Sequence, residues 1–406
     1  MVRPERRTRA DMVAAAAIAV VVAVAVGLIW WTSDARATIS RPAVVPAPNP
    51  TPARAVPSAL RELWTAASPA TGRPVVVGGT VVTGDKRTVD GRDPATGESH
   101  WRYTRGSDLC AVSWVYRYAV AVYRDDRGCG QVSTVDGSTG RRGPARSSYA
   151  DQHVTVTSDG TTVLSAGITR LELWRSDMVR MLSYGEIDAR VKPSSHGLHT
   201  GCTLTSAAAS SSAVSVLEAC PKTADLRLTL LRPAKEEDEP EQRYVPEPGI
   251  GPDSGARVLT LSDTSTAVYL PSPQPRVEVV DETGVTVAST LLPRPPSRSN
   301  AVSRPGNLVT WWTGDAVMVF DAADLTYRYT IPAVGQAVPL GPATMMAGRL
   351  LVPVTGASAS MTRLPGQRAL PAGEPGSGHV SGDAGGFGSH VIEQRGDTVV
   401  ALGPAG

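Results

Sequence analysis

The sequence predicts an all-β protein, an eight-bladed β-propeller, preceded by one apolar helix long enough to cross a membrane. A strand pattern returns about every 44 residues between 58 and 406, and turn residues divide each repeat into four short strands. Four strands at this period are typical of propeller blades. The turns that mark the repeats fall at Asp93, Asp136, Arg175, Arg232, Asp281, Asp321, Pro365 and Gly403.

The N-terminal residues predict a membrane anchor. Residues 1–12 form a basic tail with an excess of arginine, and residues 13–31 carry no charge. A helix over that run spans roughly 28 Å, close to the ~30 Å hydrocarbon core of a bilayer. The basic flank predicts a cytoplasmic N-terminus and places the propeller outside, on a single-pass protein of the cell membrane. The alternative is a signal peptide cleaved after Ala37, because Ala35-Arg36-Ala37 fits the cleavage pattern.

Residues 32–58 are predicted to be a proline-rich linker. The prolines between 41 and 58 favour an extended, semi-rigid spacer that would hold the ring ~50 Å from the membrane. The formal net charge of the chain is only +2, which lacks the basic excess that a polyanion requires. We therefore expect no nucleic-acid partner.

The propeller itself is expected over residues 59–406, closed by strands from both of its ends. The last repeat supplies three strands after residue 380, whereas residues 60–64 form a strand with no partner before the first full repeat. Pairing that strand with residues 398–402 would close the ring and remove its open edges. A seven-bladed ring, closed within one continuous segment, is the alternative.

One repeat carries a recognisable motif. Asp93, Gly97 and Trp101 follow the order Ala-x-Asp-x-x-x-Gly-x-x-Trp, with Gly91 in place of the alanine. Weaker copies keep the aspartate at Asp136, Asp281 and Asp321. The motif resembles the quinoprotein-like (PQQ-like) propeller repeat, and the chain is similar to membrane-anchored, non-catalytic propellers of high-GC Gram-positive bacteria. The resemblance implies eight blades; it does not fix a function, because the same fold serves enzymes and assembly proteins.

The four cysteines form two pairs of nearly equal spacing, Cys110 with Cys129 and Cys202 with Cys220. In each pair the first cysteine starts an innermost strand and the second is expected to end the next strand. Antiparallel neighbours bring those ends together, so we expect two disulfides within blades. An oxidising compartment outside the cytoplasm permits them. Free buried thiols are the alternative.

Two segments contain the residue types of metal sites. His196, His199 and Cys202 could converge on zinc, but a disulfide at Cys202 would remove the thiolate. The acidic run 236–241 lacks the spacing of a calcium loop and is expected to be an exposed connection that enlarges the fourth blade. Quinoprotein enzymes of this fold use adjacent cysteines, and the sequence has no such pair. We therefore expect no metal, no cofactor and no catalytic residue.

The sequence thus predicts an extracytoplasmic, membrane-anchored propeller that acts as a binding or scaffolding module in the cell envelope. Its partner would be a protein or an envelope glycan, bound by blade-connecting loops such as 194–200, 234–247 and 373–388. The alternative is an exported enzyme that acts on an envelope polymer through carboxylates in the central channel. Buried carboxylates with shifted pKa values in that channel would favour the enzyme.

Overall fold

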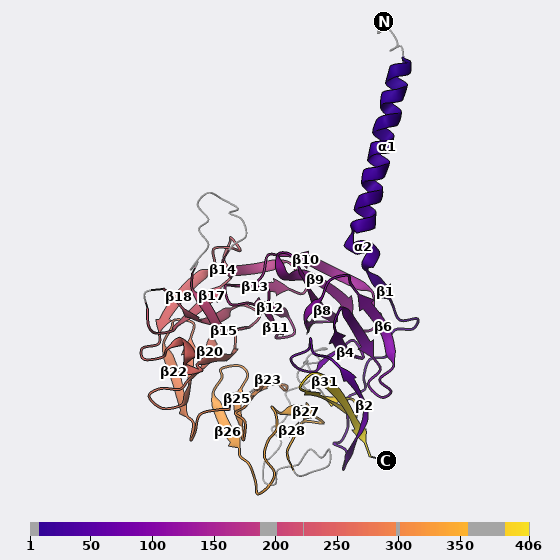
Figure 1. Cartoon of the computed structure of the whole chain (residues 1–406). Coiled ribbons are helices and arrows are strands. Elements are labelled where there is room, and N and C mark those ends of the chain that lie inside the picture. The colour runs from indigo at the N-terminus through magenta and orange to yellow at the C-terminus, as the bar shows by residue number, and fades with distance from the viewer. Residues whose placement is uncertain (1–7, 187–200, 222, 298–300, 356–385, 406) are drawn as a thin grey trace.

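The structure of the chain is a computed structural model that describes residues 8–186, 201–221, 223–297, 301–355 and 386–405. Antiparallel sheets stand side by side in a ring, and one long helix projects from its rim (Figure 1). The prediction of an all-β propeller behind an apolar helix is confirmed.

Seven sheets of four or five strands form the blades in the described residues. Blade 1 comprises β3 (Val75–Val77), β4 (Thr80–Asp85), β5 (Thr88–Arg92) and β6 (Ser99–Thr104). Blade 2 comprises β7 (Leu109–Val115), β8 (Tyr118–Asp125), β9 (Gly128–Asp136) and β10 (Arg142–Ser147). Blade 3 comprises β11 (Thr155–Ser158), β12 (Thr162–Ala166), β13 (Arg170–Arg175) and β14 (Arg180–Gly185). Blade 4 comprises β15 (Thr203–Ala209), β16 (Val214–Ala219), β17 (Arg227–Arg232) and β18 (Glu241–Pro246). Blade 5 comprises β19 (Arg257–Leu261), β20 (Ser265–Leu270), β21 (Arg276–Asp281) and β22 (Thr286–Leu291). Blade 6 comprises β23 (Ala301–Ser303), β24 (Leu308–Trp312), β25 (Val317–Asp321) and β26 (Tyr327–Ile331). The closing blade comprises β2 (Leu60–Ala67), β31 (Thr398–Pro404), β30 (His390–Arg395) and β29 (Gly386–Phe387).

The first strands of neighbouring blades contact one another around the centre, from β3 through β7, β11 and β15 to β19. The fourth strands lie at the outer rim (Figure 1). A short 3-10 helix, η1 (Pro252–Ser254), lies in the connection between blades 4 and 5. Buried side chains fill the space between blades; Trp101 and Tyr103 of blade 1, for example, pack with Tyr123 and Val135 of blade 2.

The eight-blade prediction is wrong, and the count of seven matches the stated alternative. Between blade 6 and the closing blade, the described residues contain only a two-stranded sheet of β27 (Thr344–Met346) and β28 (Arg349–Leu351). The chain before it is rich in proline, which cannot donate to a ladder, and it forms only isolated bridges such as Val334 with Ala337. The repeat turn expected at Pro365 lies outside the described residues.

The ring closes by joining its two ends. β2 pairs antiparallel with β31, from Leu60 opposite Pro404 to Ala67 opposite Thr398. This is the pairing expected from the sequence, and the alternative of closure within one continuous segment is not observed. The blade count therefore follows the alternative, whereas the closure follows the main prediction.

Two tryptophans show that the closing blade docks as an ordinary blade does. The indole nitrogen of Trp64, in β2, donates to the carbonyl oxygen of Pro94 at 3.0 Å. The indole nitrogen of Trp101, in β6, donates to the carbonyl oxygen of Gly137 at 2.6 Å. In both cases the acceptor belongs to the aspartate turn of the next blade, so Trp64 takes the place in the closing blade that Trp101 takes in blade 1.

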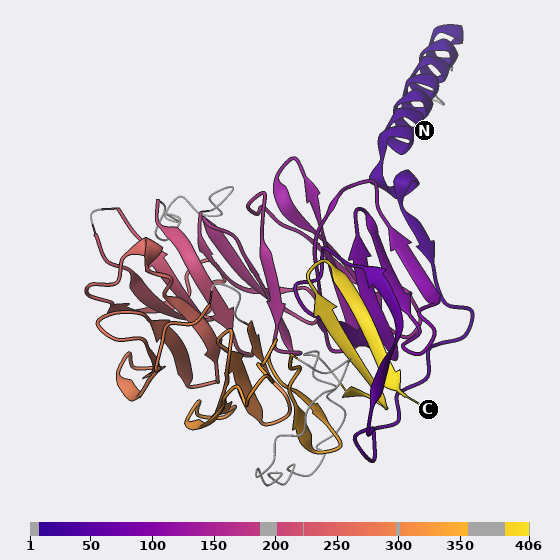
Figure 2. The same ribbon diagram turned by 60° about the horizontal axis from the view of Figure 1, so that its bottom comes forward.

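The N-terminal helix α1 (Arg9–Thr32) projects from the ring and has no buried residue (Figure 2). Thr8 caps it, because its hydroxyl accepts from the backbone N–H of Asp11 while the Asp11 carboxylate accepts from the backbone of Thr8. By its length and apolar composition, α1 is able to cross a membrane. A signal sequence near the N-terminus would meet the same criteria.

The segment after α1 is not the free spacer that its prolines predict. After a short helix, α2 (Asp34–Ala37), strand β1 (Ile39–Arg41) pairs antiparallel with β6 as a fifth strand of blade 1. Ala43 and Ala47 then donate backbone hydrogen bonds to blade 2, at 2.9 and 2.8 Å. The outer edge of β6 offers unpaired backbone groups, and the residues between the prolines keep their N–H groups. The ~50 Å separation expected from a proline spacer is therefore wrong.

Candidate functional site: the seam between blades 4 and 5

Both expected disulfides are present, but one joins different strands from those predicted. Cys202 and Cys220 lie at neighbouring ends of the first two strands of blade 4, with a Cα separation of 4.1 Å. Cys110 in β7 bonds to Cys129 at a Cα separation of 6.1 Å. Cys129 belongs to the third strand, β9, because β8 already ends at Asp125. The bond therefore ties the first strand of blade 2 to the third.

In the part of the chain that the structure describes, the predicted metal-type segments do not assemble a site. The sulfur atoms of Cys202 and Cys220 approach the Glu218 carboxylate, but both are bonded to each other and offer no thiolate. His196 and His199 lie outside the described residues. The acidic run is only partly exposed, because Glu237 turns back to blade 3 and pairs there with Arg180.

The motif aspartates have a structural role. Asp93, Asp136, Asp281 and Asp321 each lie at the turn between the third and fourth strands of a blade, and each carboxylate accepts backbone N–H groups of its own turn. Burial alone would raise the pKa of Asp136, but hydrogen bonds from Thr139, Ser138 and Arg117 lower it. These residues close the hairpins between the third and fourth strands of their blades.

A buried carboxylate joins blades 2 and 3. Glu172 of β13 is ion-paired with Arg146 of blade 2 at 3.3 Å, with Arg180 of its own blade at 3.1 Å, and with Arg170. The indole nitrogen of Trp174 also donates to it, at 2.8 Å. Burial opposes ionisation, but the charges of Arg170 and Arg146 dominate and lower the pKa of Glu172 to about 2.

Two further buried carboxylates lie at the next two blade interfaces. Glu218 of blade 4 accepts a hydrogen bond from the hydroxyl of Tyr184 in blade 3, at 2.8 Å. Burial, and then the charge of Glu218, raise the pKa of Tyr184. Glu247 follows β18 and faces Glu278 and Arg276 of blade 5; burial, and then the charge of Glu278, raise its pKa to about 7.

A cavity of about 410 Å³ opens between the inner strands of blades 3 and 4. Its lining includes His153, Thr155 and Thr157 on one side and Thr205 and Ser206 on the other, and no lining residue is acidic. The buried carboxylates described above lie between blades and do not line this cavity. The lining of this cavity therefore gives no support to the enzyme alternative.

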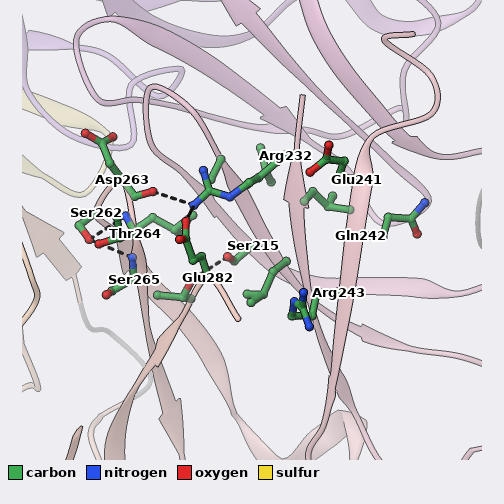
Figure 3. A pocket seen from close by; sticks show the side chains of 16 residues that line it. Ser215, Arg232, Glu241, Gln242, Arg243, Ser262, Asp263, Thr264, Ser265 and Glu282 are labelled. Atoms are coloured by element: carbon green, nitrogen blue, oxygen red, sulfur yellow. Dashed lines mark hydrogen bonds and ion pairs between the residues drawn. The ribbon is translucent and has the colours of Figure 1, made fainter. Parts of the chain in front are cut away.

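The second cavity has a mixed polar and apolar lining and lies between blades 4 and 5 (Figure 3). Blade 4 contributes Arg232 from the end of β17 and residues 241–243 from the start of β18; blade 5 contributes the turns at 262–265 and at Glu282. We call this set of residues the blade 4–5 seam. Its volume is about 110 Å³.

Arg232 connects the two blades across the seam. Its guanidinium donates to the carbonyl oxygen of Asp263 at 3.0 Å and to the carboxylate of Glu282 at 2.6 Å. Both side chains stay accessible, with relative exposures of 34% for Arg232 and 51% for Glu282. The pair is thus fixed in place and still open to solvent.

The remaining groups of the seam are held by backbone and hydroxyl contacts. The Ser262 hydroxyl accepts from the backbone N–H of Ser265 at 3.1 Å, and beneath the turn the hydroxyls of Ser215 and Thr266 lie 2.7 Å apart. Arg243 lies so close to the blade 5 turn that a Cβ at Gly284 would be 3.1 Å from its Cδ. The seam therefore presents both charge signs on a fixed frame.

The sequence analysis did not identify this seam. Its side chains come from three turns that are distant along the chain, and no motif joins them. One signal was present: the repeat alignment places Arg232 where other repeats have an aspartate, and the altered turn contributes a cation. Of the expected binding loops, 234–247 lines the seam in part, whereas 194–200 and most of 373–388 lie outside the described residues.

No family model matches this chain, and no curated protein matches it. Among solved structures, BamB from Moraxella catarrhalis aligns over 85% of this chain and 99% of its own, with 14% identity and a TM-score of 0.47. A complex of KlAtg21 with the coiled-coil of AgAtg16 aligns over 63% and 83%, with 12% identity and a TM-score of 0.41. The assignment of the propeller therefore rests on the strand pairing described above.

Proposed function

We propose that this chain is a membrane-anchored propeller that binds a protein partner outside the cytoplasm, through the blade 4–5 seam. The observation that carries the proposal is the Arg232–Glu282 pair, which is fixed between two blades and still exposed to solvent. Such a surface can exchange part of its internal pairing for charged and polar groups of another protein.

The size of the seam favours a macromolecular partner. Small-molecule sites usually have volumes of ~300–1,000 Å³ and are mostly apolar. The seam, at about 110 Å³, is smaller, and arginine, carboxylate and hydroxyl groups share its lining with apolar side chains. It can take in one or two side chains of a partner whose remaining contacts lie on the rim of the ring.

Two features support the proposed location on a membrane anchor outside the cytoplasm. Helix α1 contains 24 residues and would be about 36 Å long, enough to span a bilayer. The two disulfides favour a compartment outside the reducing cytoplasm. Since β1 begins at Ile39 and is already part of blade 1, the anchored ring would stand close to the membrane surface.

Photocrosslinking in intact cells tests the proposed partner. A photoreactive residue replaces Gln242 in the seam, and the control carries it at Gln274, an exposed residue in the β20–β21 turn at the other end of blade 5. We expect a discrete crosslinked protein from position 242 that is lost when Arg232→Glu is added, and no such product from position 274. Absence of any product at 242, or the same product at both positions, would contradict the proposal.

A further inference from the structure

We propose that the outer edge of β22 binds an extended segment of the partner protein, which joins blade 5 as a fifth antiparallel strand. The inference rests on the proposed function and specifies the chemistry of the partner: a strand of alternating β-branched, uncharged residues. The binding mode is strand addition, in which backbone hydrogen bonds supply the affinity.

The first observation is a group of exposed apolar side chains on and next to this strand. Val285, Val287 and Leu291 have relative exposures of 57, 56 and 61%, and Val287 is the extra residue at a register shift between β21 and β22. Residues 285–292 contain no charged side chain. An uncharged, β-branched strand at an edge is the type of surface to which another strand pairs.

The second observation is that the other six outer strands in the described residues differ from β22 in charge. Each of them contains a charged side chain, as follows: Arg61 and Glu62 in β2, Arg41 in β1 (the outermost strand of blade 1), Arg142 and Arg146 in β10, Arg180 in β14, Glu241 and Arg243 in β18, and Arg328 in β26. Charge on an edge strand opposes the addition of another strand. That protection is missing from β22.

The third observation concerns the backbone of β22. The N–H of Leu292 donates inward to the carbonyl of Pro275. Because N–H and C=O groups alternate in direction along an antiparallel strand, those of Leu291 and Ser289 point away from the blade. They are free to pair with a strand added at the rim.

Blade 1 already contains the arrangement that we propose for blade 5. There β1 pairs antiparallel with the outer strand β6, with Ile39 opposite Thr104 and Arg41 opposite Arg102. The outer edge of a blade in this ring can therefore carry a fifth strand. β22 offers twice the length of β1, six residues against three.

The position of β22 connects its edge with the seam. The turn that precedes β22 contains Glu282, which forms the ion pair with Arg232. A strand antiparallel to β22 would run toward that turn, so its C-terminal residues would arrive at the seam. The edge would thus hold the partner's backbone while the seam contacts the polar side chains that follow.

Hydrogen–deuterium exchange of the full-length protein in detergent micelles tests the edge with a defined probe. The probe is an end-blocked synthetic peptide with the sequence of residues 285–292 and two added lysines for solubility. We expect it to slow exchange in the β22 segment by about tenfold or more. The same peptide with alternate backbone nitrogens methylated, which cannot form the ladder, should give no protection.

Two variant pairs keep the test independent of folding. Val287→Lys adds an edge charge and should abolish the protection, whereas Val287→Thr should retain it. Ser289→Pro removes an outward N–H and should abolish it as well, whereas Ser289→Ala should not. No protection in the wild type, or equal protection with the methylated peptide or in Val287→Lys, would overturn the inference. Loss of crosslinking from Gln242 with intact peptide protection would instead overturn only the proposed function.

Discussion

The indole of Trp64 packs directly on Gly97, and this contact joins the N-terminal strand of the ring to blade 1. A Cβ at Gly97 would lie 2.7 Å from the Cγ of Trp64, closer than any side chain could fit. Trp101 stands in the same relation to Gly140 of blade 2, where a built Cβ would lie 2.3 Å from the Cβ and 2.7 Å from the Cγ of Trp101. The glycine of the repeat motif is therefore required twice over, by its positive φ and by the indole.

Replacing Gly97 with alanine should destabilise the ring through this contact. Gly97 has φ +75°, and Gly249 has φ +76° with no atom within 4 Å of a built Cβ, which makes it a matched control. Gly249→Ala should cost only the backbone strain of ~1–2 kcal/mol. Gly97→Ala should cost about 1–3 kcal/mol more, as overpacking does. Equal midpoints of denaturant unfolding for the two variants would show that Trp64 does not dock on the turn.

Glu172→Gln should destabilise the interface between blades 2 and 3. Removing the carboxylate leaves the buried Arg170 without its ion pair, and breaking a buried pair costs about 3–5 kcal/mol. The measurement is denaturant unfolding at pH 7. Glu98→Gln, at an exposed position, is the control and should change the free energy of unfolding by less than about 0.5 kcal/mol.

The same carboxylate gives a prediction for acidic pH. The pKa of Glu172 falls from 4.5 to about 2 in the folded protein. Its contribution to stability is therefore complete above pH 4.5 and is lost as the pH falls toward 2. The difference in stability between wild type and Glu172→Gln should shrink across that window, and a difference that stays constant would show that Glu172 titrates normally.

The ionisation of Glu247 should change the stability of the protein with pH in the opposite direction to that of Glu172. Its folded pKa of about 7 lies above its ordinary value of 4.5, so the folded state binds the proton more tightly than the unfolded state. The folded state consequently loses stability as the pH rises from 4.5 through 7. Glu247→Gln should melt above the wild type at pH 8 and close to it at pH 4.5. A lower melting temperature of the variant at pH 8 would contradict this.

The local features of the fold follow from the sequence because they depend on short segments. The turn aspartates and the strand that begins at Leu60 each need only a few neighbouring residues or an evident unpaired strand. Cys129 was placed on the wrong strand because β8 ends earlier than the cysteine spacing suggested. The bonds of both disulfides are nevertheless those expected.

The remaining features depend on contacts between distant segments. The prediction of eight blades fails after blade 6, where a proline-rich stretch lacks regular strand pairing. A repeat period alone does not show whether each repeat forms all four strands of a blade. The prediction of a free linker fails because the proline-rich composition indicates a solvated spacer. Composition cannot show that the outer edge of β6 is free to pair with residues of that segment. The seam unites Arg232 with Glu282 from two blades, a proximity that only the folded ring creates.

Mapping of the disulfides by mass spectrometry without reductant checks the redox state. We expect peptides linking Cys110 to Cys129 and Cys202 to Cys220. In the chain-entropy model each loop of this size contributes about 3 kcal/mol, so Cys110→Ser with Cys129→Ser should lower the free energy of unfolding by about that amount. A link between Cys129 and Cys202 would be incompatible with the blade order.

The central claim is that α1 anchors the ring outside the cytoplasm, and a topology measurement on the full chain tests it most directly. One reporter that is active only outside the cytoplasm and one that is active only inside are fused in turn to the C-terminus, which lies after Ala405 at the exposed end of β31. The account predicts activity of the first reporter alone, in the membrane fraction. Activity of the second reporter in intact cells would contradict the anchored, extracytoplasmic propeller and with it the proposed function.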